Sequence, residues 1–396
     1  MAASAVGDQL FTVVLSWVAV GLLGTAAGYL SALQAAATLA TALLAGHWAD
    51  RIEHRRLMVA ADLVRAAALL GLVATWMARG DPTVASLIGC VLVLAAGQAL
   101  FRPALQAILP ALVADTALLP ATNALLDTTE RIARLLGPGL VGVASAVLPL
   151  VHFVTLDAAT FVVSAAAVLA ILRLRPAATA PVHRASMLTG VLHGFTAVRR
   201  HPLLGFMLGV TCVINGAWYA AFFLGLPLMI EQAGVTGPGG AGLAAYGLVI
   251  SGYGSTNLLA TLVVGSRGIA RRPAWMIFGG NLFLGTGIVA LGLSGLLLPA
   301  AWMLPCFIAS AALGAIGGPM HDVTMATLRQ TVLARADMAA AVRAFMVMNQ
   351  VGTLVALLAA PVVFDATGVP QAVMLCGAAI LCVSAAGFLR HGHAVD

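Results

Sequence analysis

The chain has 396 residues, of which 61% are hydrophobic and 9% charged, and its mean hydropathy is +1.03. A soluble globular protein is nearer half apolar and a quarter charged, so this composition excludes that class and indicates a polytopic membrane protein. The 20 basic residues are all Arg and cluster between apolar runs. This pattern suits orientation in a membrane and contact with anionic lipids, and it excludes a nucleic-acid-binding surface.

The sequence contains no pattern typical of a metal, cofactor or catalytic site. Its five cysteines are scattered singly in apolar segments without a spacing such as C-x-x-C. A Gly-rich phosphate-binding loop followed by Lys is also missing, which excludes an ATP-driven pump. We therefore expect no enzyme activity, no metal and no cofactor.

Twelve apolar runs follow one another along the chain. Each has about the 20 residues that a helix needs to cross the hydrocarbon core. They lie near residues 2–22, 28–47, 57–78, 84–109, 121–147, 151–172, 202–230, 241–265, 273–296, 300–327, 339–361 and 370–389. The sequence therefore predicts an all-α membrane protein with twelve transmembrane helices.

The Arg residues lie almost entirely on one side of this predicted bundle. Loops 22–27, 78–83, 148–150, 231–240, 297–299 and 362–369 contain a single one, Arg79. The loops and helix ends of the other side contain Arg51, Arg55, Arg56, Arg173, Arg175, Arg184, Arg199, Arg200, Arg267, Arg271, Arg272, Arg329, Arg335, Arg343 and Arg390. By the positive-inside rule we expect both termini in the cytoplasm, in a bacterial inner membrane.

The longest connection divides the chain into two six-helix halves. We predict an N-terminal half at 1–172, a cytoplasmic linker at 173–201 and a C-terminal half at 202–396. Within the linker, Met187 to Arg200 can form an amphipathic helix on the membrane surface. A degenerate internal repeat supports the division, because Gly265 to Arg272 occupies in the second half the place of Gly46 to Arg56 in the first.

The loop from Gly46 to Arg56 resembles the signature G-x-x-x-D-R-x-G-R-R of the major facilitator superfamily. Gly46, Asp50 and Arg51 are on matching positions, and Arg55 and Arg56 end the motif. The variant ending is similar to that of the drug:proton antiporter branch, which contains macrolide efflux pumps and the enterobactin exporter. Further runs carry the same resemblance: Pro103 to Pro110, Asn123 to Leu126, Arg131 to Pro138 and Leu156 to Phe161.

This resemblance implies a fold and a role for the loop. Two halves would alternate in giving access to a substrate held between them near the membrane midplane. Asp50 would face the positive N-terminal end of the eleventh helix and stabilise the outward-facing state. The alternative is an ordinary basic cytoplasmic loop.

The run Gly137-Pro138-Gly139-Leu140-Val141-Gly142 resembles the antiporter motif G-P-x-x-G-G. In that motif proline bends the fifth helix, and glycines let another helix approach closely. Val141 replaces one glycine, so the motif favours export with less force than an intact copy would. An ordinary kink is the alternative.

Charged residues inside spans are costly and therefore functional candidates. Asp127, Glu130, Arg131 and Arg134 share one face of the fifth span at i, i+3, i+4 and i+7, which predicts pairing along the helix. The alternative places Arg134 in the substrate cavity. Asp62 and Arg65, one turn apart in the third span, are expected to brace the Asp50 loop.

Proton coupling needs a group that can exchange a proton inside the membrane. The candidates are Asp8, Asp322 and, third, His321, on helices that line the cavity of the fold that the resemblance implies. Asp8 fits best because its own helix has no Arg. His321 and Asp322 are adjacent and point to different faces, so at most one is expected to face the cavity.

The expected cavity lining is aromatic and amide-rich with few charges. The substrate candidates are Gln34, Arg102, Arg134, Asn215, Trp218, Tyr219, Phe222, Asn257, Asn349 and Gln350. Such a lining suits a moderately large amphiphilic molecule, whereas a phosphate or sugar acid would need several inward Arg or Lys.

The sequence therefore predicts a proton-coupled exporter of a hydrophobic or amphiphilic small molecule, working as a monomer in contact with lipid, protons and substrate. One alternative is dedicated export of a siderophore or other secondary metabolite. Another is a transporter-like receptor or scaffold, which the costly charges within the membrane disfavour.

Overall fold

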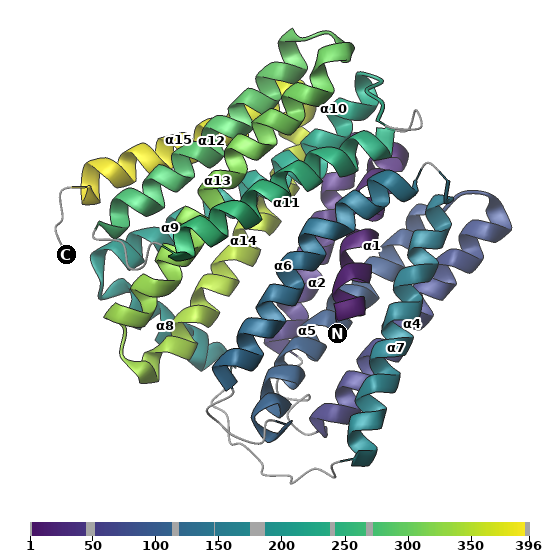
Figure 1. Ribbon diagram of the computed structural model, residues 1–396, viewed down its shortest axis with the longest axis horizontal. Helices are drawn as coiled ribbons and strands as arrows, with labels where there is room; N and C mark the ends of the chain where they lie inside the picture. The colour runs from purple at the N-terminus through teal and green to yellow at the C-terminus, as the bar shows by residue number, and fades with distance from the viewer. Residues whose placement is uncertain are drawn as a thin grey trace. The chain divides into compact units, whose positions relative to one another are not determined.

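The computed structural model describes all residues except 1, 45–51, 113–118, 146, 175–186, 238–241, 267–271 and 393–396. The described residues form helices joined by short turns, with no β-strand among them (Figure 1). In chain order the elements are α1 (Ala2–Leu23), the 3₁₀ turn η1 (Gly24–Ala26), α2 (Ala27–Leu44), α4 (His54–Arg79), α5 (Val84–Leu112), α6 (Leu119–Ala144), α7 (Leu150–Leu174), α8 (Met187–Arg199), α9 (Pro202–Tyr219), the π-helix η3 (Ala220–Gly225), α10 (Leu226–Gln232), α11 (Gly242–Ser266), α12 (Pro273–Leu297), α13 (Ala300–Val332), α14 (Arg335–Thr367) and α15 (Val369–His391).

Ten segments of the described chain are long and apolar enough to cross a membrane by length and composition. One of them, Ser4–Leu44, contains both α1 and α2, and another, Pro202–Gln232, is α9 continued through η3 and α10. The charged helix α6 is not among the ten and adds the twelfth long helix. The predicted fold class, an all-α membrane protein with twelve long helices, is confirmed.

Contacts along the chain divide it into two compact units. The first unit comprises residues 1–15 and 33–187, and the second comprises residues 16–32 and 188–396. The last part of α1 and the start of α2 therefore belong to the second unit. The predicted boundaries at residues 172 and 202 stay a prediction.

The two units repeat one scheme of helix pairing. In the first unit α4, the third long helix, packs against α5 and α7, and in the second unit its counterpart α12 packs against α13 and α15 (Figure 1). The first and fifth helices of each half also cross. A Cβ added to Gly137 of α6 would lie 2.5 Å from Cβ of Gln9 in α1, and one added to Gly216 of α9 would lie 2.5 Å from the carbonyl oxygen of Gly352 in α14.

Glycines allow the helices of the second unit to pack closely. A Cβ on Gly280 of α12 would lie 2.6 Å from the carbonyl oxygen of Gly317 in α13, and one on Gly287 would lie 2.5 Å from the backbone nitrogen of Gly314. Apolar helices in lipid gain little from burying hydrophobic surface and associate through such close backbone contact. The glycines therefore determine where α12 and α13 cross.

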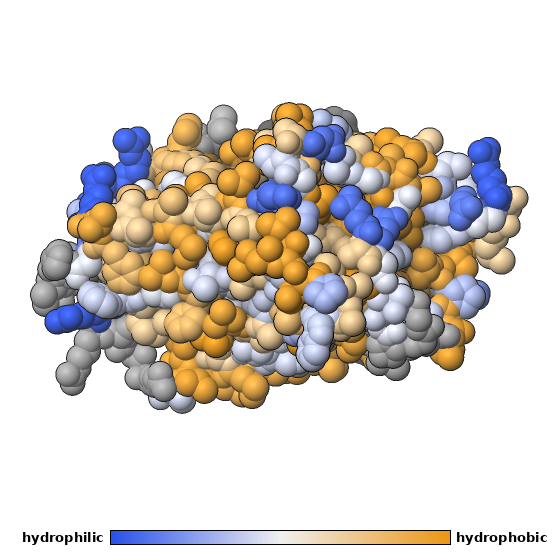
Figure 2. Space-filling model, turned by 90° about the horizontal axis from the view of Figure 1, so that it is seen from above, coloured by the Kyte–Doolittle hydropathy of each residue, from blue (hydrophilic) through white to orange (hydrophobic). Residues whose placement is uncertain are grey.

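The outer surface of the helices is largely apolar. Leu259 of α11 is 64% exposed and Val362 of α14 is 63% exposed. Figure 2 shows apolar surface over most of the visible face, interrupted by a few hydrophilic side chains. Apolar surface of this extent is stable only in contact with lipid, so the protein is a multi-pass membrane protein.

Helix α8 forms within the connection between the halves. It begins at Met187, as the sequence predicts, and ends at Arg199. Gly194 of α8 lies so close to α14 that a Cβ added to it would collide with the carbonyl oxygen of Ala340. The helix is therefore docked against the second unit.

Candidate functional site

The first unit contains a buried ion pair on α4. Asp62 and Arg65 are 0% and 3% exposed, and Nη2 of Arg65 donates to Oδ1 of Asp62. The guanidinium also stacks on two rings, 4.9 Å from the centroid of Phe101 in α5 and 4.2 Å from that of Phe161 in α7. An ion pair and two cation–π contacts together compensate the burial of the Arg charge.

The stem of Arg65 occupies space left by a glycine. A Cβ on Gly97 of α5 would lie 2.6 Å from Cγ of Arg65. The side chains of Asp62 and Arg65 thus contact α5 and α7 and tie three helices together. Gly46, Asp50 and Arg51 lie outside the described residues, so the bracing of that loop by this pair stays a prediction.

Asp8 lies on α1 and is half-buried. Its carboxylate acts electrostatically on Asp157 of α7, which is 1% exposed. The carbonyl oxygen of Asp8 accepts a hydrogen bond from Oγ1 of Thr12 at 2.7 Å. The adjacent Gly7 lies against the Asp157 carboxyl group, so α1 meets a buried carboxylate next to Asp8 that was not among the predicted site residues.

An aromatic cluster lies where α9 meets η3 and α11 in the second unit. The ring centroid of Trp218 is 5.0 Å from that of Tyr219, 5.8 Å from Phe222, 5.4 Å from Phe223 and 6.0 Å from Tyr253. Phe222 and Tyr253 meet edge to face at 5.0 Å. These distances are in the favourable range for aromatic pairs. The cluster combines three sequence-predicted residues with two, Phe223 and Tyr253, that were not predicted.

The π-helix explains why both Phe222 and Phe223 reach Trp218. In an α-helix only residues three or four positions away share a face, which would include Phe222. The i→i+5 geometry of η3, which spans Ala220–Gly225, brings the residue five positions on alongside as well. Isolated π turns of this kind are frequent at functional sites.

Amide side chains lie next to the aromatic cluster. Nδ2 of Asn215 in α9 donates to Oδ1 of Asn349 in α14 at 2.9 Å. Nδ2 of Asn257 in α11 donates to the carbonyl oxygen of Ala315 in α13 at 3.3 Å. A Cβ on Gly318 of α13 would lie 2.7 Å from Nδ2 of Asn257 and 3.8 Å from the hydroxyl of Tyr253, which places this amide beside the aromatic cluster.

The indole nitrogen of Trp218 is a buried donor. Nε1 has no hydrogen-bond partner among the described residues. An unsatisfied buried N–H is costly, and native structures rarely keep one unless a ligand or water satisfies it. The cluster can therefore offer one hydrogen-bond donor within an aromatic surround.

The predicted polar residues of α13 separate onto two faces. His321 is half-buried, and its Nδ1 lies 2.8 Å from Oδ1 of the buried Asn281 in α12. Asp322 is exposed and interacts electrostatically with Arg329, two turns further along α13. The guanidinium of Arg329 lies 5.1 Å from the ring centroid of Phe345 in α14.

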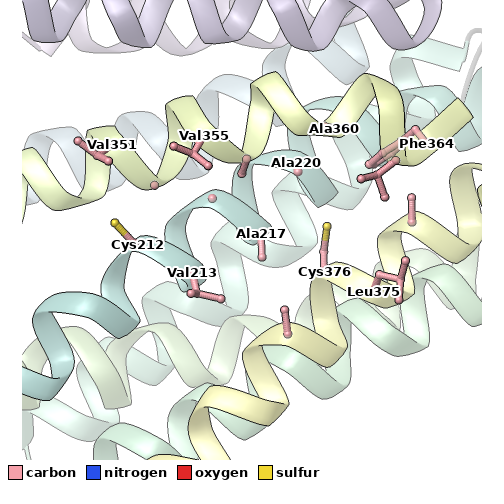
Figure 3. Close-up of a pocket in the computed structure, with 16 residues that line it drawn as sticks. Cys212, Val213, Ala217, Ala220, Val351, Val355, Ala360, Phe364, Leu375 and Cys376 are labelled. Atoms are coloured by element: carbon pink, nitrogen blue, oxygen red, sulfur yellow. The ribbon is translucent and has the colours of Figure 1, made fainter. Parts of the chain in front are cut away.

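A cavity of about 390 Å³ lies between α9, α14 and α15 (Figure 3). Its walls are small and aliphatic side chains, the ring of Phe364 and the thiols of Cys212 and Cys376. Val355 and Leu375 on its wall are 60% and 51% exposed, so the cavity is open at its side. Gly216 and Ala217 line it, whereas the neighbouring Asn215 and Trp218 do not. It suits hydrocarbon and is separate from the aromatic cluster.

The other predicted residues are placed as follows. Of the cavity candidates, Gln34 and Gln350 are half-buried and Arg102 is exposed. At the start of α4, Arg55 is buried, and Nε of the exposed Arg56 lies 2.8 Å from Oε2 of Glu53. Gly137 and Pro138 are buried in α6, where Gly137 meets α1 as the motif implies. Asp127, Arg131 and Arg134 are on α6 with Glu130, but their side chains lie outside the described part of the structure.

No group of three or more His, Cys, Asp or Glu residues that could hold a metal ion occurs among the described residues.

Residues 1–357 match the Major Facilitator Superfamily. The chain belongs to this superfamily. No curated protein sequence matches it at a significant level. As a major facilitator protein it has the fold and family of transporters, which implies a small-molecule substrate.

Solved structures share its fold. A bacterial homologue of the iron transporter ferroportin in the inward-facing state has a TM-score of 0.75 at 13% identity, over 99% of this chain and 97% of that one. A POT family transporter in complex with 5-aminolevulinic acid has a TM-score of 0.69 at 13% identity, over 99% and 95%. An auto-inhibited POT family peptide transporter has a TM-score of 0.71 at 14% identity, over 99% and 95%.

Two residues of this major facilitator protein that were not predicted as site residues nevertheless have a signal in the sequence. Asp157 is a carboxylate in the middle of an apolar span, and Tyr253 is an aromatic residue one turn before Asn257. Phe223 could not be found in this way, because α-helical spacing places it on a different face from Trp218.

Proposed function

We propose that this major facilitator protein is a proton-coupled secondary active transporter that exports a hydrophobic or amphiphilic small molecule by alternating access. It would act as a monomer in a bacterial inner membrane, with both termini in the cytoplasm. The family and fold give the class of transporter. The substrate class, the proton coupling and the direction are inferred from individual residues.

The observation that carries the substrate class is the cluster around Trp218. Four aromatic rings surround Trp218 and its buried indole N–H, with amides of Asn215 and Asn257 nearby, and none of these seven residues has a charged side chain. Aromatic faces bind flat apolar groups and organic cations, and a single donor orients a substrate carbonyl or ether oxygen. The cluster therefore suits an amphiphile with an aromatic or cationic part and one hydrogen-bond acceptor.

Two further features support proton coupling and export. Asp8 is a half-buried carboxylate on α1, and groups of this kind within membrane helices commonly belong to proton or ion paths. The Gly137-Pro138 motif, with Gly137 against α1, resembles the antiporter pattern except at Val141. The antiporter resemblance is the reason for preferring export.

The test compares two Trp variants with the parent. In cells loaded with an amphiphilic fluorescent dye such as ethidium, Trp218→Ala should slow efflux at least tenfold at matched protein level. Trp302→Ala is the matched control, because Trp302 is 64% exposed on α13 and should not affect efflux. Equal efflux by the Trp218→Ala protein and the parent would remove the aromatic cluster from the substrate path.

A further inference from the structure

We propose that the buried carboxyl group of Asp157 in α7, together with Asp8 of α1, binds and releases one proton, and that these two residues are the proton-binding site of the transport cycle. The inference deepens the proposed function and rests on it for the role in transport. Its geometric basis is the crossing of α1 and α7 in the first unit.

Asp157 is a buried carboxylate with an oxygen that can still accept or bind a proton. The residue is 1% exposed, and its Oδ2 has no hydrogen-bond partner within the described part of the chain. Oδ1 lies 3.3 Å from the hydroxyl of Thr160, which also donates to the carbonyl oxygen of Asp157 at 2.8 Å. One hydroxyl shared between two acceptors satisfies little of a full negative charge. A bound proton would make the unpartnered oxygen a neutral hydroxyl.

A glycine lets the carboxyl group of Asp157 point at α1. A Cβ added to Gly7 would collide with Oδ1 of Asp157 and lie 2.6 Å from Oγ1 of Thr160. The Asp157 side chain therefore occupies the space that any other residue at position 7 would need. Asp8 follows Gly7 directly, and its carboxylate acts electrostatically on Asp157.

Four helices contribute titratable or charged groups to this place. They are Asp8 from α1, Asp62 and Arg65 from α4, the thiol of Cys90 from α5, and Asp157 itself. Arg65 forms its ion pair with Asp62 and lies between two aromatic rings, and it also acts electrostatically on Asp157.

Burial makes a charge on Asp157 costly, and a second carboxylate on α1 adds to that cost, so we expect the site to retain a proton. A proton arriving from water adds to a carboxylate oxygen of the pair and forms an O–H bond, and its departure to water reverses this step. No other bond changes. Each exchange alters the charge of the pair by one, which is the change that a proton-driven transporter needs.

Infrared spectroscopy of the purified full-length protein tests the pair without any substrate. The C=O stretch of a protonated carboxyl group is distinct from that of a carboxylate. The parent should show such a band near neutral pH that disappears on titration to alkaline pH. Asp157→Asn should remove it, and Asp8→Asn should change its frequency and the pH at which it disappears, because Asp157 stays buried without the second carboxylate.

A matched control and a conservative variant complete the design. Asp81→Asn alters an exposed carboxyl group between α4 and α5 and should leave the band unchanged. If Asp157→Asn does not fold, Asp157→Glu keeps the carboxyl group, and the proposal requires the band to persist at a shifted frequency. A parent without the band, a band that survives Asp157→Asn, a band that Asp8→Asn leaves unchanged in frequency and pH dependence, or a band that sodium ions abolish at constant pH would overturn the proposal.

This readout also separates the inference from the proposed function. A protein with the expected band but no pH-gradient-driven transport of any amphiphile would retain the proton pair and lose the proposed function. A protein that exports a dye against its gradient at the expense of a proton gradient, but lacks the band, would keep the function and lose the pair.

Discussion

Nε2 of His193 in α8 lies 2.7 Å from Oδ1 of Asp337 in α14, a contact that is an ion pair when the imidazole is protonated. The pair joins the helix of the connecting segment to the beginning of the eleventh long helix. Next to it, Gly194 lies against the backbone of Ala340 and Gly190 against the guanidinium of Arg343. The connecting helix is thus fixed to α14 by two glycines and one exposed ion pair.

The docking of α8 should depend on Gly194 far more than on the ion pair. An exposed ion pair contributes only ~0.2–1 kcal/mol, so His193→Ala should raise hydrogen exchange of α8 amides by a few-fold at most. Gly194→Val places a branched side chain against the Ala340 carbonyl and should release α8, raising exchange more than tenfold. Thr196→Val, on the exposed face, is the control. Equal protection in the Gly194→Val protein and the parent would show that the contact is not needed.

The crossing of α9 and α14 should not tolerate a methyl group. A Cβ on Gly216 would lie 2.5 Å from the Gly352 carbonyl oxygen and 2.7 Å from Cβ of Ala356. Overpacking of this kind costs about 1–3 kcal/mol, so Gly216→Ala should lower the thermal midpoint in detergent. Gly209→Ala, on the same helix with nothing within 4 Å of its added Cβ, should leave the midpoint unchanged or raise it. A similar midpoint for both variants would contradict the observed crossing.

Loss of Arg65 alone should lower the stability of the protein more than loss of both charges of the buried pair on α4. Arg65→Ala leaves Asp62 buried without its counter-ion and should cost about 3–5 kcal/mol of stability. Arg65→Lys keeps the charge but loses stacking on Phe101 and Phe161, so it should also destabilise the protein. The double variant Asp62→Leu with Arg65→Met should recover most of the loss. Arg79→Ala, exposed at the end of α4, serves as the control. A mild effect of Arg65→Ala would mean that water reaches Asp62.

The Arg asymmetry predicts which loops face the cytoplasm. In a cysteine-free background, Thr236→Cys should react with an impermeant thiol reagent added outside cells, and Thr196→Cys should not. Thr236 is exposed beyond α10, whereas a side chain at the adjacent Gly237 would lie 2.5 Å from the backbone nitrogen of Ala245. Labelling of both cysteines from outside would refute the predicted orientation.

The positions of the helices could be predicted because each span must be long and apolar. The predicted runs 84–109, 202–230 and 273–296 each end within three residues of the last residue of the observed helix, which is α5, α10 and α12 respectively. The largest discrepancies are at α13 and α14, which extend to Val332 and Thr367. Their ends are less apolar than a span, so hydropathy alone stops short of them.

The contacts between helices could not be predicted in this way. Helices that are apolar on every face carry no stripe that indicates which side faces a neighbour, so the crossing of Gly216 with Gly352 and the approach of Gly7 to Asp157 required the structure. The π-helix at Ala220–Gly225 likewise has no distinctive sequence. Among the site residues, Trp218, Tyr219 and Phe222 could be proposed from one span, whereas the pairing of Asn215 with Asn349 and the contacts of Trp218 with Phe223 and Tyr253 appear only in three dimensions.

Proton exchange for substrate is the central claim, and everted membrane vesicles test it most directly. When their interior is made acidic, the parent protein should accumulate ethidium inside while protons leave, and a protonophore should abolish both. Asp8→Asn should abolish accumulation against the gradient while retaining downhill dye exchange, and Asp81→Asn should behave as the parent. Dye accumulation by the parent without proton movement, or full pH-driven accumulation by the Asp8→Asn protein, would contradict the account.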